Sequence, residues 1–258
     1  MILDEILGRT RADLAVRQRQ RPLDALVSAA RAQPAARSFG AALRRPGQIT
    51  CIAEFKRRSP SAGAIRDGAE PGPIAATYAA AGAAAMSVLT DEPFFGGSLE
   101  DLRAARAATP ALPILRKDFM VDRYQVAEAR AAGADAILII VAALNDDDIA
   151  GLLHAAAEFS VDALVEAHDE SEVRRAVALG ARIVGVNNRD LKTFTMDREL
   201  CIRLRPLVPP DRVMVAESGI RDVADVRSLH AAGIDAVLVG ETLMRAADPG
   251  AALRALLA

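Results

Sequence analysis

The sequence predicts an α/β fold, a closed (β/α)8 barrel of the TIM type with an N-terminal helical extension. From residue 50 onward, Ala-rich helical stretches alternate with short runs of Val, Ile and Leu, and eight such units can be counted. This alternation is typical of a parallel sheet covered by helices, and eight units favour closure into a barrel. The chain length of 258 residues also suits a single barrel. No GxGxxG or GxxxxGKS/T element is present, which argues against an open nucleotide-binding sheet.

The first 47 residues are expected to form the helical extension. Apolar residues recur among charged ones over 2–19, which predicts an amphipathic helix. Pro22 separates this stretch from a second predicted helix at 23–31. We expect residues 1–47 to pack across a barrel formed by residues 48–258, so that the whole chain makes one domain.

Eight β-strands are predicted along the barrel region. Four of them follow a glycine that ends the preceding helix, at Gly82, Gly133, Gly180 and Gly233. Glycine suits this place because it readily adopts the positive φ with which many helices end. The apolar run at 136–144 is too short to span a bilayer, so we interpret it as one of these strands with its following loop. The predicted strands are 50–56, 85–90, 113–117, 135–141, 161–167, 182–187, 212–217 and 235–240.

The composition argues against several classes of function. With 52% apolar residues, 26% charged residues and a net charge of −2, the chain suits a soluble globular protein. Aromatic residues make up only 3% of the chain, and the arginines near the N-terminus are interleaved with acids, so no nucleic-acid partner is expected. Cys51 and Cys201 lack metal-ligand spacing, and the N-terminus does not resemble a secretory signal. We therefore expect a cytoplasmic protein with reduced thiols and no membrane partner.

The segment CIAEFKRRSPS at 51–61 changes from an apolar strand to polar residues at its C-terminal end. Because side chains alternate along a strand, Glu54 and Lys56 should face one side while Ala53 and Phe55 face the other. An acid and a base therefore share one surface, which indicates the beginning of a functional site.

Polar residues also end most of the other predicted strands. Active sites of this barrel form at the C-terminal ends of the strands, so these residues should meet at one rim. Such a cluster would be costly to desolvate without a ligand, which favours a polar substrate over ordinary ion pairs. The strand-end residues are Glu54 and Lys56, Asp91, Lys117 and Asp118, Glu166 and His168, Asn187 and Arg189, and Glu217 and Ser218.

Glycines end the last two predicted strands, in AESGI at 216–220 and LVGETL at 238–243. Gly219 and Gly240 allow backbone N–H groups to approach an anion, and the helices that open after them would add positive potential. Barrels of this type often bind phosphate after strands seven and eight. We therefore expect a phosphorylated small molecule as the substrate.

Seven motifs, in order along the chain, resemble those of the indole-3-glycerol-phosphate synthase family. They are AEFKRRSPS, SVLTDEPFFGGS, LRKDF, LVEAHDE, VGVNNRDL, AESGI and VGETLM, and the resemblance covers nearly the whole chain. Members of this family work in tryptophan biosynthesis, where they close the indole ring of 1-(2-carboxyphenylamino)-1-deoxyribulose 5-phosphate with loss of CO2 and water. Ala167 and Phe55 depart from the residues common in the family, but both should face away from the site.

The resemblance implies roles for five catalytic residues. Lys117 corresponds to the general acid that protonates the ketone oxygen, and Glu166 to the general base that takes the proton released as the ring forms. Lys56 resembles the lysine that binds the anthranilate carboxylate and assists the later dehydration. Glu54 and Asn187 match residues that position the substrate and stabilise the transition state. We also expect the charge of Lys56 to lower the pKa of Lys117 toward the working range.

The same resemblance implies a set of substrate-binding residues. Arg189 would support the carboxylate side of the pocket, Glu217 and Ser218 would lie near the ribulose hydroxyls, and Phe94 would contact the substrate. No cofactor and no metal are implied, and we expect a monomer whose 57–68 segment closes over the substrate. The implied phosphate positions are Ser59, Gly219, Gly240 and Glu241, the last through its backbone N–H.

Three alternative functions share the same barrel. An aldolase-type enzyme would use Lys56 or Lys117 to form a Schiff base, which borohydride would trap. The neighbouring isomerase of the same pathway would need an acid–base pair suited to an Amadori rearrangement. A non-catalytic binder of a phosphorylated metabolite would need neither a lysine acid nor a glutamate base. A metal enzyme is not expected, because His154, His168 and His230 are scattered along the sequence.

Overall fold

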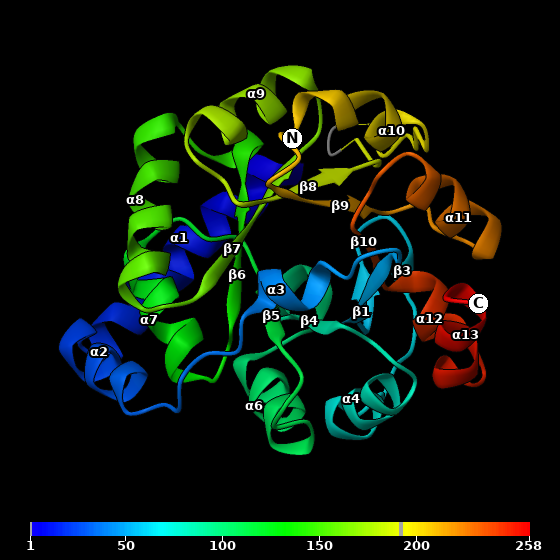
Figure 1. The fold of residues 1–258 in the computed structure, drawn as a ribbon. Helices are drawn as coiled ribbons and strands as arrows, with labels where there is room; N and C mark the ends of the chain where they lie inside the picture. The colour runs from blue at the N-terminus through cyan, green and yellow to red at the C-terminus, as the bar shows by residue number, and fades with distance from the viewer. Residues whose placement is uncertain (1, 191–192) are drawn as a thin grey trace.

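The computed structural model describes residues 2–190 and 193–258, and its centre is a closed barrel of eight parallel strands (Figure 1). Consecutive strands pair around the barrel, and the last strand closes on the first. The predicted fold is therefore confirmed, and each strand begins and ends within one residue of its predicted bounds. The strands are β1 (Thr50–Phe55), β4 (Ala85–Leu89), β5 (Ile114–Lys117), β6 (Ala136–Ile140), β7 (Asp162–Ala167), β8 (Ile183–Asn187), β9 (Val213–Glu217) and β10 (Ala236–Val239).

Helices cover the outside of the barrel between successive strands. Gly82, Gly133, Gly180 and Gly233 have φ values of 95°, 95°, 87° and 82°, which confirms the left-handed conformation expected where the helices end. Within the described residues, we find no helix of sufficient length and apolarity to cross a membrane. The helices of the barrel are α4 (Pro71–Ala80), α6 (Leu99–Ala108), α7 (Arg123–Ala131), α8 (Asp146–Glu158), α9 (Glu170–Ala178), α10 (Leu200–Leu204), α11 (Val223–Ala231) and α13 (Pro249–Leu256), with short turns α5 (Glu92–Phe95), η1 (Val141–Ala143), η2 (Arg205–Leu207) and α12 (Glu241–Arg245).

The apolar side chains of the strands divide between two cores. In β1, Ile52 joins a core inside the barrel, whereas Cys51, Ala53 and Phe55 join the core between the sheet and the helices. Ala167 also belongs to the outer core, so Ala167 and Phe55 both face away from the barrel interior, as expected. The alternation carries every second side chain of a strand inward, and the last inward position lies at the mouth of the barrel.

The N-terminal extension contains α1 (Ile2–Gln20), α2 (Leu23–Arg31) and α3 (Phe39–Leu43). The first two helices were predicted, and α2 packs beside α7 on one side of the barrel (Figure 1). The five-residue helix α3 was not predicted. Its Phe39 and Leu43 are fully buried and join the inner core, and the backbone N–H of Gly40 donates to Asp162 at the start of β7. The third helix therefore closes the N-terminal end of the barrel.

The loop after β1 contains a short antiparallel pair, β2 (Arg58–Ser59) and β3 (Gly63–Ala64), which was not predicted. The guanidinium of Arg57 donates to both carboxylate oxygens of Asp101, over 2.6 and 2.8 Å. Arg58 donates to the carbonyl oxygens of Glu92 and Pro93 in α5. These bonds hold the loop beside the mouth, where its closure over a ligand stays a prediction.

Candidate active site

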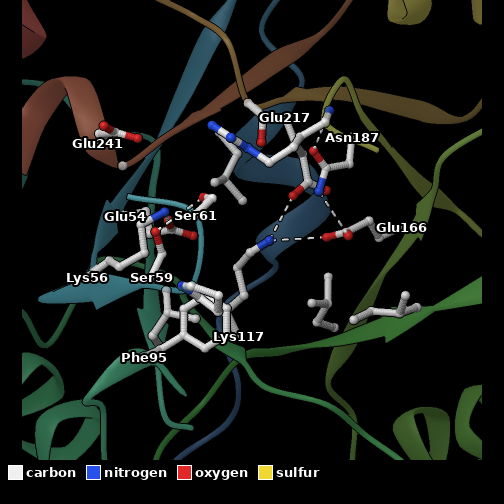
Figure 2. Close-up of a pocket in the computed structure, with 18 of the residues that line it drawn as sticks. Glu54, Lys56, Ser59, Ser61, Phe95, Lys117, Glu166, Asn187, Glu217 and Glu241 are labelled. Carbon is white, nitrogen blue, oxygen red and sulfur yellow. Dashed lines mark hydrogen bonds and ion pairs between the residues drawn. The ribbon is translucent and has the colours of Figure 1, made fainter. Parts of the chain in front are cut away.

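A cavity opens at the C-terminal ends of the strands, and the predicted rim residues point into it from several strands (Figure 2). Glu54 comes from β1, Lys117 from β5 and Glu166 from β7, each at the last inward position of its strand. The structure thus brings together residues that are far apart in the sequence. The predicted site residues that line the cavity are Glu54, Lys56, Ser59, Lys117, Glu166, Asn187, Arg189, Glu217, Ser218, Gly219, Gly240 and Glu241.

Lys117 lies between two carboxylates at the centre of this cavity (Figure 2). Its Nζ is 3.1 Å from Oε2 of Glu166 and 2.9 Å from Oε2 of Glu217, and it donates to both. The amide Nδ2 of Asn187 donates to the other oxygen of Glu166, Oε1, over 3.1 Å. The backbone N–H of Arg189 in turn donates to Oδ1 of Asn187, which fixes the orientation of the amide. One lysine, two glutamates and one asparagine therefore form a connected network.

The surroundings of Lys117 raise its pKa, so the prediction that Lys56 would lower it is wrong. Burial alone lowers the pKa of this ammonium, but the nearby negative charges of Glu166, Glu217 and Glu54 outweigh burial. Lys56 itself is paired, with Nζ 2.7 Å from Oε1 of Glu54. Lys117 is therefore a cation before any ligand binds.

The two carboxylates that share Lys117 differ in their proton affinity. Burial raises the pKa of both, but Lys117, His168 and Asn187 together hold the pKa of Glu166 below its usual range. For Glu217, burial and the charge of Glu166 raise the pKa, and only Lys117 opposes them. One ammonium cannot neutralise two buried carboxylates, so Glu166 carries the negative charge and Glu217 is the one that retains a proton more readily.

Glu54 and Lys56 form the second acid–base pair of the cavity, on the side of β1. The hydroxyl of Ser87 lies 3.5 Å from Oε2 of Glu54, and Oε1 pairs with Lys56. The prediction that these two side chains share one face of the strand is confirmed. Lys56 is more exposed than Glu54, so its ammonium is the part of the pair that a ligand can reach.

Two glycines provide the space for the buried carboxylates. A Cβ atom on Gly240 would lie 2.4 Å from Oε1 of Glu54, and a Cβ atom on Gly185 would lie 2.2 Å from Oε1 of Glu217. Both positions face the barrel interior beside a strand-end glutamate. The prediction from sequence missed Gly185, because a glycine inside an apolar strand has no pattern that marks it as part of a site.

The expected phosphate positions lie together on one side of the cavity. The hydroxyl of Ser59 accepts the backbone N–H of Ala62, and Gly240 precedes α12 without a side-chain cap. The first N–H groups of a helix have no partner within it, so those at the start of α12 can meet an anion. The side chain of Glu241 pairs instead with Arg245, over 2.9 Å.

The sequence predicted that a helix begins directly after Gly219, and this prediction is wrong. Gly219 has a φ of 78° and forms a turn together with Ser218, but α11 begins only at Val223. The carboxylate of Asp222 accepts the N–H groups of Ala224 and Asp225 and so caps this helix. On this side an anion can meet the turn at Gly219 but not the N-terminus of α11.

Part of the cavity wall is apolar. The rings of Phe95 and Phe119 lie with their centroids 6.1 Å apart, and Leu138 and Ile140 of β6 lie beside them. The helix α1 completes the wall with Ile2, Leu3 and Ile6. The prediction from sequence missed the contribution of the extension, because an amphipathic helix does not show which surface its apolar face will cover.

Phe95 lines the cavity in place of the predicted Phe94. The carboxylate of Asp91 caps α5 by accepting the N–H groups of both phenylalanines. Consecutive side chains of a helical turn point in directions about 100° apart, so only one of the two can face the cavity. The dipeptide alone could not decide which.

The remaining strand-end residues stabilise the rim. Asp91 caps α5, and Asp118, which also lines the cavity, binds the guanidinium of Arg116 and the hydroxyl of Thr90. His168 lies behind Glu166, outside the cavity lining. Among the residues described by the structure, no three or more His, Cys, Asp or Glu side chains are arranged to bind a metal ion.

Comparison with known families gives a match over almost the whole chain. A family model described as indole-3-glycerol phosphate synthase matches residues 3–256. The chain is 51% identical to indole-3-glycerol phosphate synthase 2 of Streptomyces coelicolor, covering 99% of this chain and 98% of the relative. It is 49% identical to indole-3-glycerol phosphate synthase of Rhodopirellula baltica, covering 100% and 99%.

Solved structures with low sequence identity share the fold. The chain superimposes on 3-hexulose-6-phosphate synthase from Salmonella typhimurium with a TM-score of 0.63, at 16% identity and covering 81% of this chain and 96% of that one. Thiamine phosphate pyrophosphorylase from Pyrococcus furiosus gives a TM-score of 0.61, at 17% identity and covering 80% and 93%. At such identities the likeness concerns the barrel alone.

Proposed function

Because the chain belongs to the indole-3-glycerol phosphate synthase family, the carboxy-lyases of tryptophan biosynthesis, we propose that its barrel mouth closes the indole ring of 1-(2-carboxyphenylamino)-1-deoxyribulose 5-phosphate. The reaction joins an arene carbon to the ketone carbon and then loses CO2 and water. The substrate brings its own electron-rich carbon nucleophile, so the protein must supply a proton donor, a proton acceptor and sites for two anions. The observation that carries the proposal is the position of Lys117 between Glu166 and Glu217.

We assign the general acid to Lys117 and the general base to Glu166. As the arene carbon attacks, the ketone oxygen gains negative charge and takes a proton from the ammonium of Lys117. Glu166 is held as an anion, so it can accept the proton released as the ring becomes aromatic. A ketone oxygen that binds between Lys117 and the carboxylates would replace one of the two glutamates as a hydrogen-bond acceptor of the Lys117 ammonium. This exchange weakens the attraction that raises the pKa of Lys117 and makes it a better acid.

We assign Lys56 to the anthranilate carboxylate and to the later dehydration. Its ammonium is the exposed member of the pair with Glu54, so it can bind an anion while Glu54 keeps it in place. Arg189 would support the same carboxylate. Asn187 would position the substrate through its bond with Glu166, and Glu217 and Ser218 would lie near the ribulose hydroxyls.

We assign the phosphate to the side formed by Ser59, Gly219, Gly240 and Glu241. The unpaired N–H groups at the start of α12 would bind it, with the N–H of Glu241 among them. The apolar wall with Phe95 and Phe119 would hold the arene.

The state of Lys117 argues against the aldolase-type alternative. A Schiff base requires a neutral amine, whereas the carboxylates around Lys117 raise its pKa and keep it a cation. We therefore expect no covalent adduct when borohydride is added to the protein and its ketone substrate. A trapped adduct would instead support the aldolase-type function.

The proposed function is tested by mixing the protein with this substrate and following indole fluorescence. Lys117→Met and Glu166→Gln should each lower kcat by at least about a hundredfold, the usual contribution of one proton-transfer group. Glu158→Gln, at an exposed carboxylate of α8, is the matched control and should retain activity. A wild-type protein that binds the substrate without forming indole would contradict the proposal.

A further inference from the structure

His168 connects the base Glu166 to the first turn of α9, a contact that the chemistry above does not use. Its Nε2 lies 3.2 Å from Oε1 of Glu166, and its Nδ1 lies 3.2 Å from Oε2 of Glu172. The contact with Glu166 is an ion pair whose alignment falls short of a hydrogen bond. Only 9% of the histidine side chain is exposed, so these two carboxylates are its main polar surroundings.

The two contacts determine the protonation state of the ring. A carboxylate only accepts hydrogen bonds, and a neutral imidazole can donate from one nitrogen alone. Only the imidazolium presents an N–H and a positive charge to both Glu166 and Glu172. Burial alone would lower the pKa of His168, but these two carboxylates outweigh it and raise the pKa to about 10.

Helix capping does not explain the position of this side chain. At three helices the backbone N–H before the cap donates to a side chain four residues later: Val121 to Gln125, His168 to Glu172, and Arg221 to Asp225. The capping bond therefore needs only the backbone of the first residue. Arg221 directs its side chain outward, with 57% exposed, whereas His168 directs its ring inward to Glu166.

We propose that His168 and Glu172 are positioning residues that orient Glu166 and keep it a carboxylate in its buried place. This proposal rests on the assignment of Glu166 as the general base. His168 contacts Oε1, the oxygen that also accepts Asn187, and leaves Oε2 for Lys117 and the substrate. When the ammonium of Lys117 turns to the ketone oxygen, His168 remains as the cation beside Glu166.

The charged groups around the pair come from three elements. Lys117 of β5 and Glu217 of β9 face Glu166, and their effects on its charge oppose each other. Glu172 of α9 faces the histidine, and Asp169 at the start of this helix lies close enough to sense its charge. Removal of the histidine charge therefore leaves Glu166 with Lys117 as its one cationic neighbour among the described residues.

The first test compares the pH dependence of kcat/KM in the wild type, His168→Asn and Glu172→Gln. Glutamine at 172 can still accept the backbone N–H of residue 168, so it keeps the capping bond and removes only the negative charge. Loss of a neighbouring cation raises the pKa of Glu166, so the acid limb should move to higher pH by about one unit in His168→Asn, a tenfold loss at low pH. Glu172→Gln should not raise it, because at the low pH of this limb the ring of His168 stays protonated beside Glu166. KM should stay within about threefold, since one hydrogen bond to the substrate is worth more than that.

Asp225→Asn is the matched control, because it alters the same capping bond in α11 at a distance from Glu166. It should leave the acid limb where it is in the wild type. A fall in activity that is uniform across pH in His168→Asn, with an unmoved acid limb, would show a merely structural role and overturn the proposal.

The second test needs no substrate. The 15N shifts of the His168 ring should show both nitrogens protonated to well above pH 8 in the wild type, and Glu172→Gln should lower the midpoint. A ring that titrates near the ordinary histidine pKa of 6.5 in the wild type would also overturn the proposal. Failure of the proposed function appears separately, as a wild-type protein that forms no indole.

Discussion

Gly185 and Gly240 lie beside the two carboxylates that hold the catalytic lysines in place. Both glycines face the barrel interior. The atom nearest to an added Cβ would be a carboxylate oxygen, of Glu217 at Gly185 and of Glu54 at Gly240. A carboxylate can occupy the inside of a barrel only where the facing strand leaves room for it. The reactive side chains of this site therefore depend on residues that have no side chain.

The first prediction concerns Gly185→Ala. The added Cβ would meet Oε1 of Glu217 at 2.2 Å and force this side chain to move, which removes its bond to Lys117. We expect kcat/KM to fall by about ten- to a hundredfold, since misplacement of a site residue by about an ångström has effects of this size.

Gly151→Ala is the matched control for this substitution. Gly151 lies in α8, and a Cβ there would have nothing within 4 Å. The control should retain activity and gain roughly 0.5–1 kcal/mol of stability, as alanine does in a helix. Full activity in Gly185→Ala would contradict the account of Glu217.

At the residue scale, the sequence predicts which side chains meet at the rim, but not their exact orientation or the balance of charges around them. The strand periodicity placed Lys117, Glu166 and Glu217 at one rim, because period two leaves little choice of face. It could not separate Phe94 from Phe95, nor show that Lys117 has more negative than positive neighbours. Both properties depend on contacts across the barrel that only the closed structure defines.

Among the secondary-structure elements, β5 is joined to the helices outside the barrel by a network of buried ion pairs. Its Arg116 is 1% exposed and faces away from the cavity, where Nη2 binds Asp118 and Nη1 binds Glu128 of α7. Glu128 also pairs with Arg17 of α1, over 3.1 Å. One buried network thus links the strand that carries Lys117 to the helix that completes the apolar wall.

The second prediction concerns Arg116→Met. This change removes the cation and leaves Asp118 and Glu128 buried with fewer partners, which typically costs about 3–5 kcal/mol. Urea denaturation should show a loss of this size in the free energy of unfolding. Arg174→Met, at an exposed pair with Glu170 in α9, should change it by less than about 0.5 kcal/mol. Equal effects of the two changes would contradict the structural role of the network.

At the element scale, long helices and strands were predicted accurately, whereas very short ones were missed. The eight strands and the helices of the extension at 2–20 and 23–31 carry a full apolar pattern and were located within about a residue. The five residues of α3 and the two-residue strands β2 and β3 are too short for any periodicity to show. Tertiary contacts, such as the burial of Phe39 in the inner core, determine these short elements.

For the whole molecule, the third prediction concerns the pH dependence of stability. The pKa of His168 rises on folding from 6.5 to about 10. Its contribution to stability is therefore fully present below pH 6.5 and is lost as the pH rises through about 10. The free energy of unfolding of His168→Asn should lie below that of the wild type by about 1.5–3 kcal/mol near pH 6, the range for hydrogen bonds to charged groups. This difference should shrink toward pH 10.

Thermal or urea unfolding at several pH values measures this difference. His154→Asn, at an exposed histidine of α8, is the control and should change stability by less than about 0.5 kcal/mol at each pH. A difference for His168→Asn that stays constant from pH 6 to pH 10 would contradict the imidazolium bridge.

The central claim is that Lys117 starts the reaction by protonating the ketone oxygen during ring closure. A single-turnover experiment tests this claim most directly. CO2 release and indole fluorescence are recorded together for the wild type, Lys117→Met and Lys56→Met, with substrate binding measured separately. The wild type should release CO2 and form indole in equal amounts. Lys117→Met should bind the substrate and yield neither product, because ring closure precedes both losses, whereas Lys56→Met should release CO2 faster than it forms indole. Release of CO2 by Lys117→Met at the wild-type rate would contradict the account.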